Sequence, residues 1–237
     1  MTAQRFMQAS SLILTLLCLA ACAKKTTAFA PPPPYPTLAD PEPSLQESLF
    51  KGDQAVLSNQ DIDRILSAHI DLSDRRRLVA LGIGPRNIWL PEVAVIDEQN
   101  SVQFLKALAS APNLTQVRMM PQLLVPEKRT VPYLREAAAR FQADLLLVYA
   151  TRIRTFQRDR ILAASEVNAE ASAEAVLLDV RTGIVVQSAH TSEAIAAKKA
   201  PTDLNFAQTV AKTQEEATGR ALLKLADSVT AFLKETK

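Results

Sequence analysis

The 237-residue sequence is poor in the residues that most often carry chemistry. It contains two cysteines, two histidines, one tryptophan and five glycines, and only 5% of its residues are aromatic. Cys18 and Cys22 are four residues apart, whereas the redox motif is Cys-x-x-Cys, which argues against a redox pair. A metal site would need further ligands, and only His69 and His190, far along the chain, are left to supply them. We therefore expect no metal and no cofactor.

Signatures of catalysis are equally scarce. The sequence has no G-x-S-x-G elbow, and Gly82-Ile83-Gly84 fits neither GxGxxG nor GxxxxGK[ST]. A hydrolase triad needs a histidine beside a nucleophile, but both histidines have structural interpretations. His69 lies near the end of an expected helix, where a cation is favoured, and His190 lies on an expected strand. The carboxylates are scattered, as on a solvated surface, so no catalytic residue is predicted and the protein is not expected to be an enzyme.

Charge is nearly balanced along the whole chain. Lysine and arginine total 27, aspartate and glutamate total 25, and the formal net charge is +2. A general nucleic-acid binder would carry a strong basic bias, so no nucleic-acid partner is expected. Hydrophobic residues make up 48% of the sequence. With so few aromatic residues, the core has to be built mainly from leucine, valine, isoleucine and alanine.

The N-terminus has the pattern of a bacterial signal peptide. Arg5 is the only charge before Lys24, and the run SSLILTLLCLAACA lies between them. The run has the length of a signal-peptide core and is shorter than the roughly 20 apolar residues of a membrane-spanning helix. Leu19-Ala20-Ala21-Cys22 resembles the lipobox of bacterial lipoproteins. In that family a peptidase cuts just before the cysteine, here between Ala21 and Cys22, and the new N-terminal cysteine carries acyl chains.

This resemblance implies a cellular location for the protein. Residues 1–21 would be a signal peptide that is removed together with Cys18, and the lipid on Cys22 would attach the mature chain to a membrane. Ala23 follows the cysteine in place of the aspartate associated with inner-membrane retention, which favours the periplasmic face of the outer membrane. Two other interpretations stay open: a plain secretory peptide cut nearby, and the apolar start of a cytosolic protein.

Proline gathers immediately after the lipobox. Seven of the fourteen prolines lie within residues 31–43. Consecutive prolines favour an extended conformation of about 3.1 Å per residue, so a tract of about 20 residues reaches roughly 60 Å. We expect residues 22–44 to be a lipidated tether and residues 45–237 to be a periplasmic domain. A proline-rich ligand for another protein is the alternative.

The first half of this domain predicts alternating helices and strands. Ser58 followed by Asp61 has the pattern of a capping box and predicts a helix start. The apolar residues that follow at helical spacing are Ile62, Ile65 and Leu66. A charged start followed by an apolar run, ended by glycine and proline, predicts a buried strand over residues 77–83.

Three further elements are expected before residue 142. A helix is expected near residues 100–110, with Val102, Leu105 and Ala109 on one face and Phe104 and Leu108 beside it. The next strand contains Pro121, which indicates an edge strand or a break. Thr130 is the expected N-cap of another helix, because Pro132 is acceptable in a first helical turn.

The second half predicts three strands and a terminal helix. Residues 145–149 are uniformly apolar, as in a strand buried on both faces, and the alternation from Ala150 onward carries that strand into solvent. Residues 161–180 are rich in alanine, which suits a helix, but apolar and polar residues alternate from Val167 to Ala175, so a strand is predicted. A turn is expected at Asp179–Gly183, then a returning strand, and a helix from about Asp203 to the end.

Together these elements predict an α/β (α+β) fold. The expected architecture is a single mixed sheet of about five strands, flanked by helices, with a long C-terminal helix. The segments ADLLLVYATRIRTF and LLDVRTGIVVQS, followed by a helix, resemble the curli-secretion-channel lipoprotein superfamily. That superfamily also includes periplasmic activators of penicillin-binding proteins, and it shares a small α/β core with the N-terminal domain of the Tol translocation protein. The resemblance covers residues 58–235 and rests on element order, the Asp179–Gly183 turn and the lipobox.

The resemblance implies a non-enzymatic role in envelope assembly, secretion or cell-wall synthesis, often through oligomers. A membrane barrel needs strands of roughly 9 to 11 residues with an apolar face and aromatic girdles. Only residues 151–170 fit that length, and their arginines, alanines and acids suit water better, so pore formation by this chain alone is not expected. Whether these residues form a hairpin or are partly helical stays open.

The candidate partner surface consists of arginines and one aromatic residue. Four arginines gather around one expected strand and turn: Arg152, Arg154, Arg158 and Arg160. They suit an acidic partner or lipid head groups, or form a charged rim that keeps the protein soluble. Trp89, the only tryptophan, contacts a partner or covers the edge of the core. The leading hypothesis is a non-catalytic envelope lipoprotein that binds an envelope protein. A self-oligomerising secretion or pore component and an envelope hydrolase are the alternatives.

Overall fold

A computed structural model describes residue 49 and residues 58–84, 90–158 and 165–235. The chain divides into two units, Met1–Glu42 and Pro43–Lys237, and every described residue belongs to the second. The predicted signal peptide and tether, including Ala21 and Cys22, lie outside the described residues.

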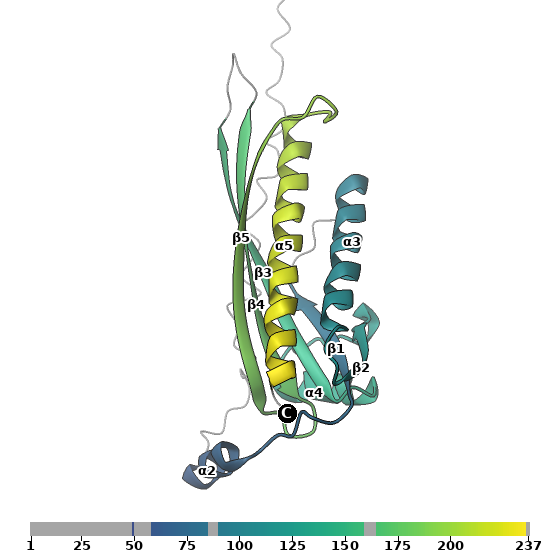
Figure 1. Cartoon of the computed structure of the whole chain (residues 1–237), viewed down its shortest axis with the longest axis vertical. Helices are drawn as coiled ribbons and strands as arrows, with labels where there is room; N and C mark the ends of the chain where they lie inside the picture. The colour runs from purple at the N-terminus through teal and green to yellow at the C-terminus, as the bar shows by residue number, and fades with distance from the viewer. Residues whose placement is uncertain (1–48, 50–57, 85–89, 159–164, 236–237) are drawn as a thin grey trace, which may run out of the picture. The chain divides into compact units, whose positions relative to one another are not determined.

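A five-stranded mixed sheet organises the second unit (Figure 1). The strands are β1 (Arg76–Ile83), β2 (Leu114–Met119), β3 (Leu145–Arg158), β4 (Glu166–Asp179) and β5 (Val185–Lys198). They lie in the order β2-β1-β3-β4-β5. β1 runs parallel to β2 and β3, whereas β3, β4 and β5 are successively antiparallel. The predicted fold class and the single mixed sheet are confirmed.

The helices cover both faces of this sheet. They are α2 (Asn59–Ser67), α3 (Pro91–Leu108), the 3-10 turn η2 (Gln122–Leu124), α4 (Val131–Arg140) and α5 (Phe206–Glu235). Side chains of α3 and α5 pack into one core cluster with one face of the sheet, and side chains of α4 pack into a second cluster on the opposite face. The predicted order of elements, including the long final helix, is confirmed.

The capping residues explain where these helices begin. The Ser58 hydroxyl accepts a hydrogen bond from the N–H of Asp61 at 3.1 Å, as the capping-box pattern predicted. Thr130 occupies the N-cap of α4, but its side chain makes no capping hydrogen bond there. α5 begins after Asn205, whose side-chain oxygen accepts from the N–H of Gln208 at 2.9 Å. The caps at Ser58 and Asn205 each satisfy an N–H group that the first helical turn leaves without a partner.

The alanine-rich segment is strand β4, as its period of two predicted. The residues of one face are Val167, Ala169, Ala171, Ala173, Ala175 and Leu177, and all of them are buried. Ala217 and Ala221 of α5 belong to the same core cluster. Many of these positions carry alanine, whose side chain is only a methyl group. The 30-residue helix α5 can therefore lie close along β3, β4 and β5 (Figure 1).

The buried face of α3 differs from the expected one. Phe104 and Leu108 are fully buried, whereas Ala109 is exposed and Val102 is 59% exposed. The helix begins at Pro91, well before the expected start, and Val93 is its first buried residue. Val93, Phe104 and Leu108 recur on one stripe of a 3.6-residue helix, and that stripe turns Val102 outward.

α2 has an apolar face that the rest of the described chain does not cover. No residue of this helix is buried, and its apolar residues Ile62, Ile65 and Leu66 are exposed. The helical spacing of these residues correctly predicted a helix, but not a core-facing one. His69 follows the end of α2 and is exposed. Pro121 lies just beyond β2, an edge strand that ends at Met119, which confirms the expected break.

The turn between β4 and β5 depends on a glycine. The Asp179 carboxylate accepts hydrogen bonds from the N–H and the hydroxyl of Thr182, at 2.8 and 2.7 Å. Gly183 has a φ of 78°, in the left-handed region. An alanine there is strained by roughly 1–2 kcal/mol.

We therefore expect Gly183→Ala to lower the free energy of unfolding by about 1–2 kcal/mol. Urea unfolding followed by circular dichroism measures the change. Arg181→Ala, in the same turn, is the matched control and should change the free energy by less than about 0.5 kcal/mol, because its side chain is exposed. Equal effects of the two substitutions would show that the turn does not depend on the backbone conformation of Gly183.

An ion pair joins the start of β1 to the residue before β3. The Arg77 guanidinium donates to both carboxylate oxygens of Asp144 at 3.0 Å, and the Arg77 N–H donates to the same carboxylate at 2.8 Å. These hydrogen bonds hold the pKa of Asp144 below its usual range. The ionised carboxylate therefore stabilises the fold at neutral pH, and this stabilisation is lost as the pH falls from about 4 through the lowered pKa.

Asp144→Asn is expected to make the free energy of unfolding less dependent on pH under acidic conditions. The free energy of unfolding of the variant should fall less steeply than that of the wild type between about pH 5 and pH 2, because the carboxylate that takes up the proton is gone. Urea titrations at successive pH values measure this slope. Asp227→Asn, at an exposed position on α5, is the control and should leave the slope unchanged.

Candidate functional site

Strand β3 has two halves with different surroundings. Leu145–Val148 are buried, and β1 pairs with β3 only as far as the partners Ile83 and Ala150. Among the described residues, no strand lies on the β1 side of Thr151–Arg158. On the other side, β4 pairs with β3 along its whole length, as far as Arg158 and Glu166. Within the described residues, the second half of β3 is therefore paired along one edge and open along the other.

Four exposed side chains form a row along this half-strand, which we name the arginine strip. The arginine strip consists of Arg152, Arg154, Phe156 and Arg158, which are all exposed. Alternate residues of a strand point to the same face, so the four share one face of the sheet. It is the face opposite α5, because Thr155 on the other face accepts a hydrogen bond from Gln214 of α5 at 2.8 Å.

The charges of the strip are not matched by bound carboxylates. In the register of the sheet, Glu170 lies opposite Arg154 and Glu166 lies opposite Arg158. Within the part of the chain that the structure describes, no ion pair joins these residues, and Glu166 instead lies 3.6 Å from the Lys198 ammonium. The three arginines of the strip therefore have no close ion-pair partner among the described residues, although glutamates of β4 lie opposite two of them.

Phe156 gives the strip an apolar component. Its side chain is 66% exposed, although burying a phenylalanine is worth about 1.5–3 kcal/mol. It lies at a hollow of about 520 Å³ at the far ends of the three long strands, where its neighbours include Asn168, Ala196 and Lys198. A large exposed aromatic side chain among unpaired arginines is typical of a protein-binding surface, since aromatic residues and arginine are enriched at interfaces.

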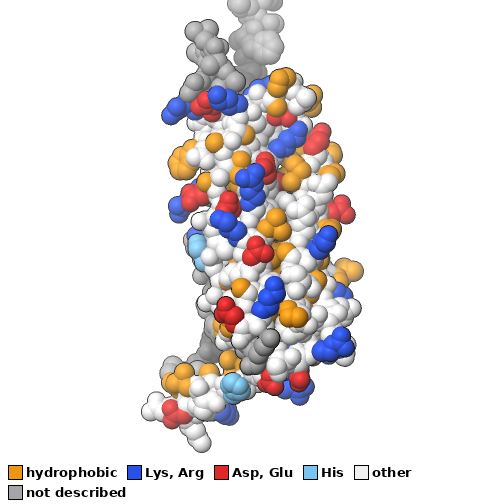
Figure 2. All heavy atoms as spheres, in the orientation of Figure 1, with side chains coloured by type: hydrophobic (Ala, Val, Ile, Leu, Met, Phe, Trp, Pro, Cys, Tyr) orange, Lys and Arg blue, Asp and Glu red, His pale blue; other side chains and the backbone are white. Residues whose placement is uncertain are grey.

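The helical face of the sheet has a different charge pattern. Figure 2 shows basic and acidic side chains interspersed on the surface that α5 and α3 form. Lys224 pairs with Glu193 of β5, and Arg220 pairs with Glu216 one helical turn away. Paired charges of both signs are typical of a solvated surface, in contrast to the arginine strip on the opposite face.

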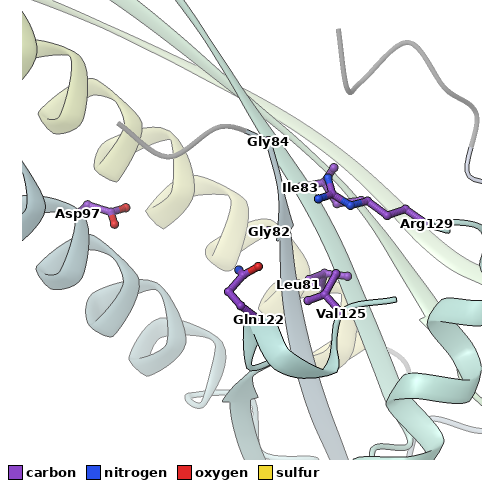
Figure 3. Close-up of a pocket in the computed structure, with 8 residues that line it drawn as sticks. All are labelled: Leu81, Gly82, Ile83, Gly84, Asp97, Gln122, Val125 and Arg129. Atoms are coloured by element: carbon purple, nitrogen blue, oxygen red, sulfur yellow. The ribbon is translucent and has the colours of Figure 1, made fainter. Parts of the chain in front are cut away.

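A second hollow lies at the carboxyl ends of β1 and β2 (Figure 3). It has a volume of about 450 Å³. It forms because β2 stops at Met119 while β1 continues to Ile83. The connection from β1 to β2 runs through α3 on one face, and the connection from β2 to β3 runs through α4 on the other. Open α/β sheets bind ligands at such switch points.

The groups around this hollow are few and partly charged. Figure 3 places Asp97 of α3 and Arg129 on opposite sides of β1, with Gln122 near the base. A Cβ atom at Gly82 would lie 2.9 Å from the Tyr149 side chain, so a larger residue there would force that side chain to shift. The glycines of Gly82-Ile83-Gly84 were the only sequence signal for this feature, and they do not form a nucleotide loop. The hollow lacks the convergent set of polar groups that defines a small-molecule site.

The structure tests only some of the predicted site residues. Arg152 and Arg154 lie on β3, where the alternation predicted a strand, whereas Arg158 was expected in a turn and instead ends the same strand. Arg160 and Trp89 lie outside the described residues. His190 lies on β5 with its Nδ1 atom 3.6 Å from Glu174, and it is exposed. Within residues 58–84, 90–158 and 165–235, no group of three potential metal-ligating side chains comes together.

The sequence by itself does not assign the chain to a family. No protein-family model matches it, and no curated protein sequence matches it. The superfamily resemblance therefore remains a prediction.

Several solved structures are similar in fold, and at least three of them, including the first two below, are described as lipoproteins. A minor lipoprotein from Acinetobacter baumannii is 13% identical, with a TM-score of 0.34, over 68% of this chain and 94% of that chain. A lipoprotein from Neisseria meningitidis is 15% identical, with a TM-score of 0.30, over 67% of this chain and 99% of that chain. The PelC dodecamer from Paraburkholderia phytofirmans is 15% identical, with a TM-score of 0.29, over 63% of this chain and 89% of that chain. At these levels of similarity, none of them assigns a function to this chain.

Proposed function

We propose that the chain is a non-catalytic envelope lipoprotein whose periplasmic domain binds a protein partner. The lipid on Cys22 anchors it to the periplasmic face of the outer membrane, and the partner acts in envelope assembly, secretion or cell-wall synthesis. The observation that carries the proposal is the arginine strip. It combines unpaired positive charge, an exposed phenylalanine and an open strand edge on one supported element.

The proposed attachment to the outer membrane is inferred from the N-terminal sequence. The order of charge, apolar core, Leu-Ala-Ala-Cys and proline-rich tract is that of a lipoprotein precursor. Among the described residues, no helix is long and apolar enough to cross a bilayer. The proposal that the protein is not an enzyme rests on the scarcity of histidine and cysteine and on the absence of a recognised catalytic motif in the sequence.

Charge reversal of the strip tests the proposal. In Arg152→Glu/Arg154→Glu/Arg158→Glu, we expect the proteins that crosslink to the wild type to be recovered at least about tenfold less, because like charges oppose an acidic partner. Chemical crosslinking in intact cells, affinity purification and quantitative mass spectrometry measure the recovery. Lys106→Glu/Arg181→Glu/Lys234→Glu is the matched control, with the same charge change at exposed positions elsewhere. An unchanged list of partners in the strip variant would contradict the proposal.

A second candidate function is self-assembly, which the other edge of the sheet favours. β5 is an edge strand of 14 residues, without proline or glycine in its sequence. Long edges of this kind pair with other chains unless they are protected. Light scattering on the purified full chain in detergent, over a hundredfold range of concentration, tests this candidate. A monomer at every concentration would exclude it.

A further inference from the structure

We propose that the open edge of β3, Thr151–Arg158, binds an extended acidic segment of the partner by strand addition. The proposal rests on the proposed function and specifies it, because it names the chemistry of the partner and the manner in which it binds. Three observations carry it: the open edge, the row of unpaired arginines, and the position of Phe156 within that row.

The main chain of this edge is held ready for pairing. β4 pairs with every residue from Thr151 to Arg158, without a register shift. Alternate residues of a strand direct their N–H and C=O groups to the same side, so half of this segment presents hydrogen-bonding groups to the open edge. A strand of this length extends for roughly 26 Å at about 3.3 Å per residue. No proline, glycine or bulge interrupts it, and among the described residues its charged arginine side chains are what opposes pairing.

The side chains of the strip define which segment fits. When a new strand pairs beside β3, its side chains on the open face lie directly beside those of the strip and interact with them. Arg152, Arg154 and Arg158 favour acidic residues at three alternate positions, and Phe156 favours an apolar residue at the fourth. Read along the new strand, the pattern is acidic, acidic, apolar, acidic at every second position. It is reversed if the strand runs the other way.

Neither β5 nor β3 of a second copy supplies such a segment. The open-face residues of β5 are Ser188, His190, Ser192, Ala194, Ala196 and Lys198, which include no carboxylate. Pairing β3 with β3 of another copy would place arginines beside arginines, and like charges directly opposite each other are destabilising. Charge complementarity therefore favours a different, acidic protein as the occupant of this edge.

Synthetic peptides test the proposal on the full chain in detergent. The probe is the acetylated and amidated octapeptide ETETVTET, and the control is EEETTVTT, which has the same composition without the alternation. We expect ETETVTET to slow amide hydrogen exchange in residues 151–158 by at least about tenfold, and to bind at least about tenfold more weakly to the triple arginine-to-glutamate variant. Lys106→Glu/Arg181→Glu/Lys234→Glu should bind like the wild type. Equal binding of the two peptides would reduce the strip to a nonspecific charged surface and overturn the proposal.

Backbone methylation separates strand addition from charge alone. Two further peptides carry N-methyl groups on alternate residues of ETETVTET, one set on the odd and one on the even positions. In strand addition, only one set of N–H groups faces β3, so one methylated peptide should lose binding and the other should retain it. If both bind equally, the peptide does not pair through its main chain.

A lipid ligand is tested with vesicles that contain anionic phosphatidylglycerol. Slower hydrogen exchange of residues 151–158 with these vesicles, but not with the peptide, would assign the arginine strip to lipid binding.

The outcomes distinguish this proposal from the proposed function. If charge reversal removes the crosslinked partners but ETETVTET does not protect residues 151–158, strand addition is wrong and partner binding stands. If the peptide protects the strand but charge reversal leaves the crosslinked partners unchanged, the edge binds acidic strands and the partner binds elsewhere.

Discussion

Cys22→Ser is expected to abolish lipidation and to leave the signal peptide attached. The diacylglyceryl group can be transferred only to a thiol, and in lipoproteins cleavage follows this transfer. Each buried methylene of an acyl chain contributes about 0.8 kcal/mol to membrane binding, and one chain alone anchors only marginally. A cysteine with several chains therefore provides lasting attachment, and a serine provides none.

Cys18→Ser is the matched control for this experiment. It makes the same exchange of sulfur for oxygen four residues earlier, within the apolar run that would be discarded. We expect Cys18→Ser to incorporate radiolabelled palmitate like the wild type and Cys22→Ser to incorporate none. Mass spectrometry should find residues 1–21 retained in Cys22→Ser. The predicted attachment site would be refuted if Cys22→Ser incorporated palmitate, or if Cys18→Ser failed to incorporate it.

The length of the predicted tether determines how far the domain can lie from the membrane. A proline-rich tract of about 20 residues spans roughly 60 Å when extended. The proposed anchor would thus hold the domain in the periplasm without pressing it against lipid. The arginine strip could then bind a partner segment at a distance from the membrane surface, as a protein ligand requires.

The sheet was predictable because its signals are local. The alternation along β4 decided between strand and helix, although alanine favours a helix. The uniformly apolar start of β3 indicated burial on both faces, and α4 on one side and α5 on the other provide it. The turn at Asp179–Gly183 was predictable because its hydrogen bonds and its positive φ involve neighbouring residues.

Burial of the helical faces was less predictable, since it depends on what the rest of the fold provides. The apolar residues of α2 have helical spacing, yet no element of the described chain covers them. In α3, the residues of two neighbouring faces are apolar, and contact with the sheet and α5 selects the face of Phe104 over the face of Val102. Composition alone does not distinguish these two faces.

The candidate site was predictable in composition but not in form. The spacing of Arg152, Arg154 and Arg158 places them on one face of any strand. The open edge beside them exists only because β1 stops pairing at Ala150, and that register depends on tertiary contacts. The hollow at β1 likewise depends on where β2 ends and on which face each helix crosses, which no local pattern specifies.

Phe104→Ala is expected to produce the largest loss of stability in the described domain. The Phe104 side chain has no exposed surface, and its ring centroid lies 5.0 Å from that of Tyr149. Removing a buried phenylalanine side chain costs about 3–5 kcal/mol, because transfer energy is lost and a cavity remains. Domains are commonly stable by only about 5–15 kcal/mol, so the variant should lose a large part of its total.

Val102→Ala, on the same helix, is the control that tests the assignment of the buried face. Val102 is mostly exposed, and alanine has a higher helix propensity than valine, so the change should stay within about 0.5 kcal/mol. Urea unfolding measures both variants, and an unchanged dependence on urea concentration would show that the unfolded state is the same. A larger loss for Val102→Ala than for Phe104→Ala would mean that α3 faces the sheet with the residues expected from sequence. α3 would then have to rotate about its axis, which would separate the ring of Phe104 from that of Tyr149.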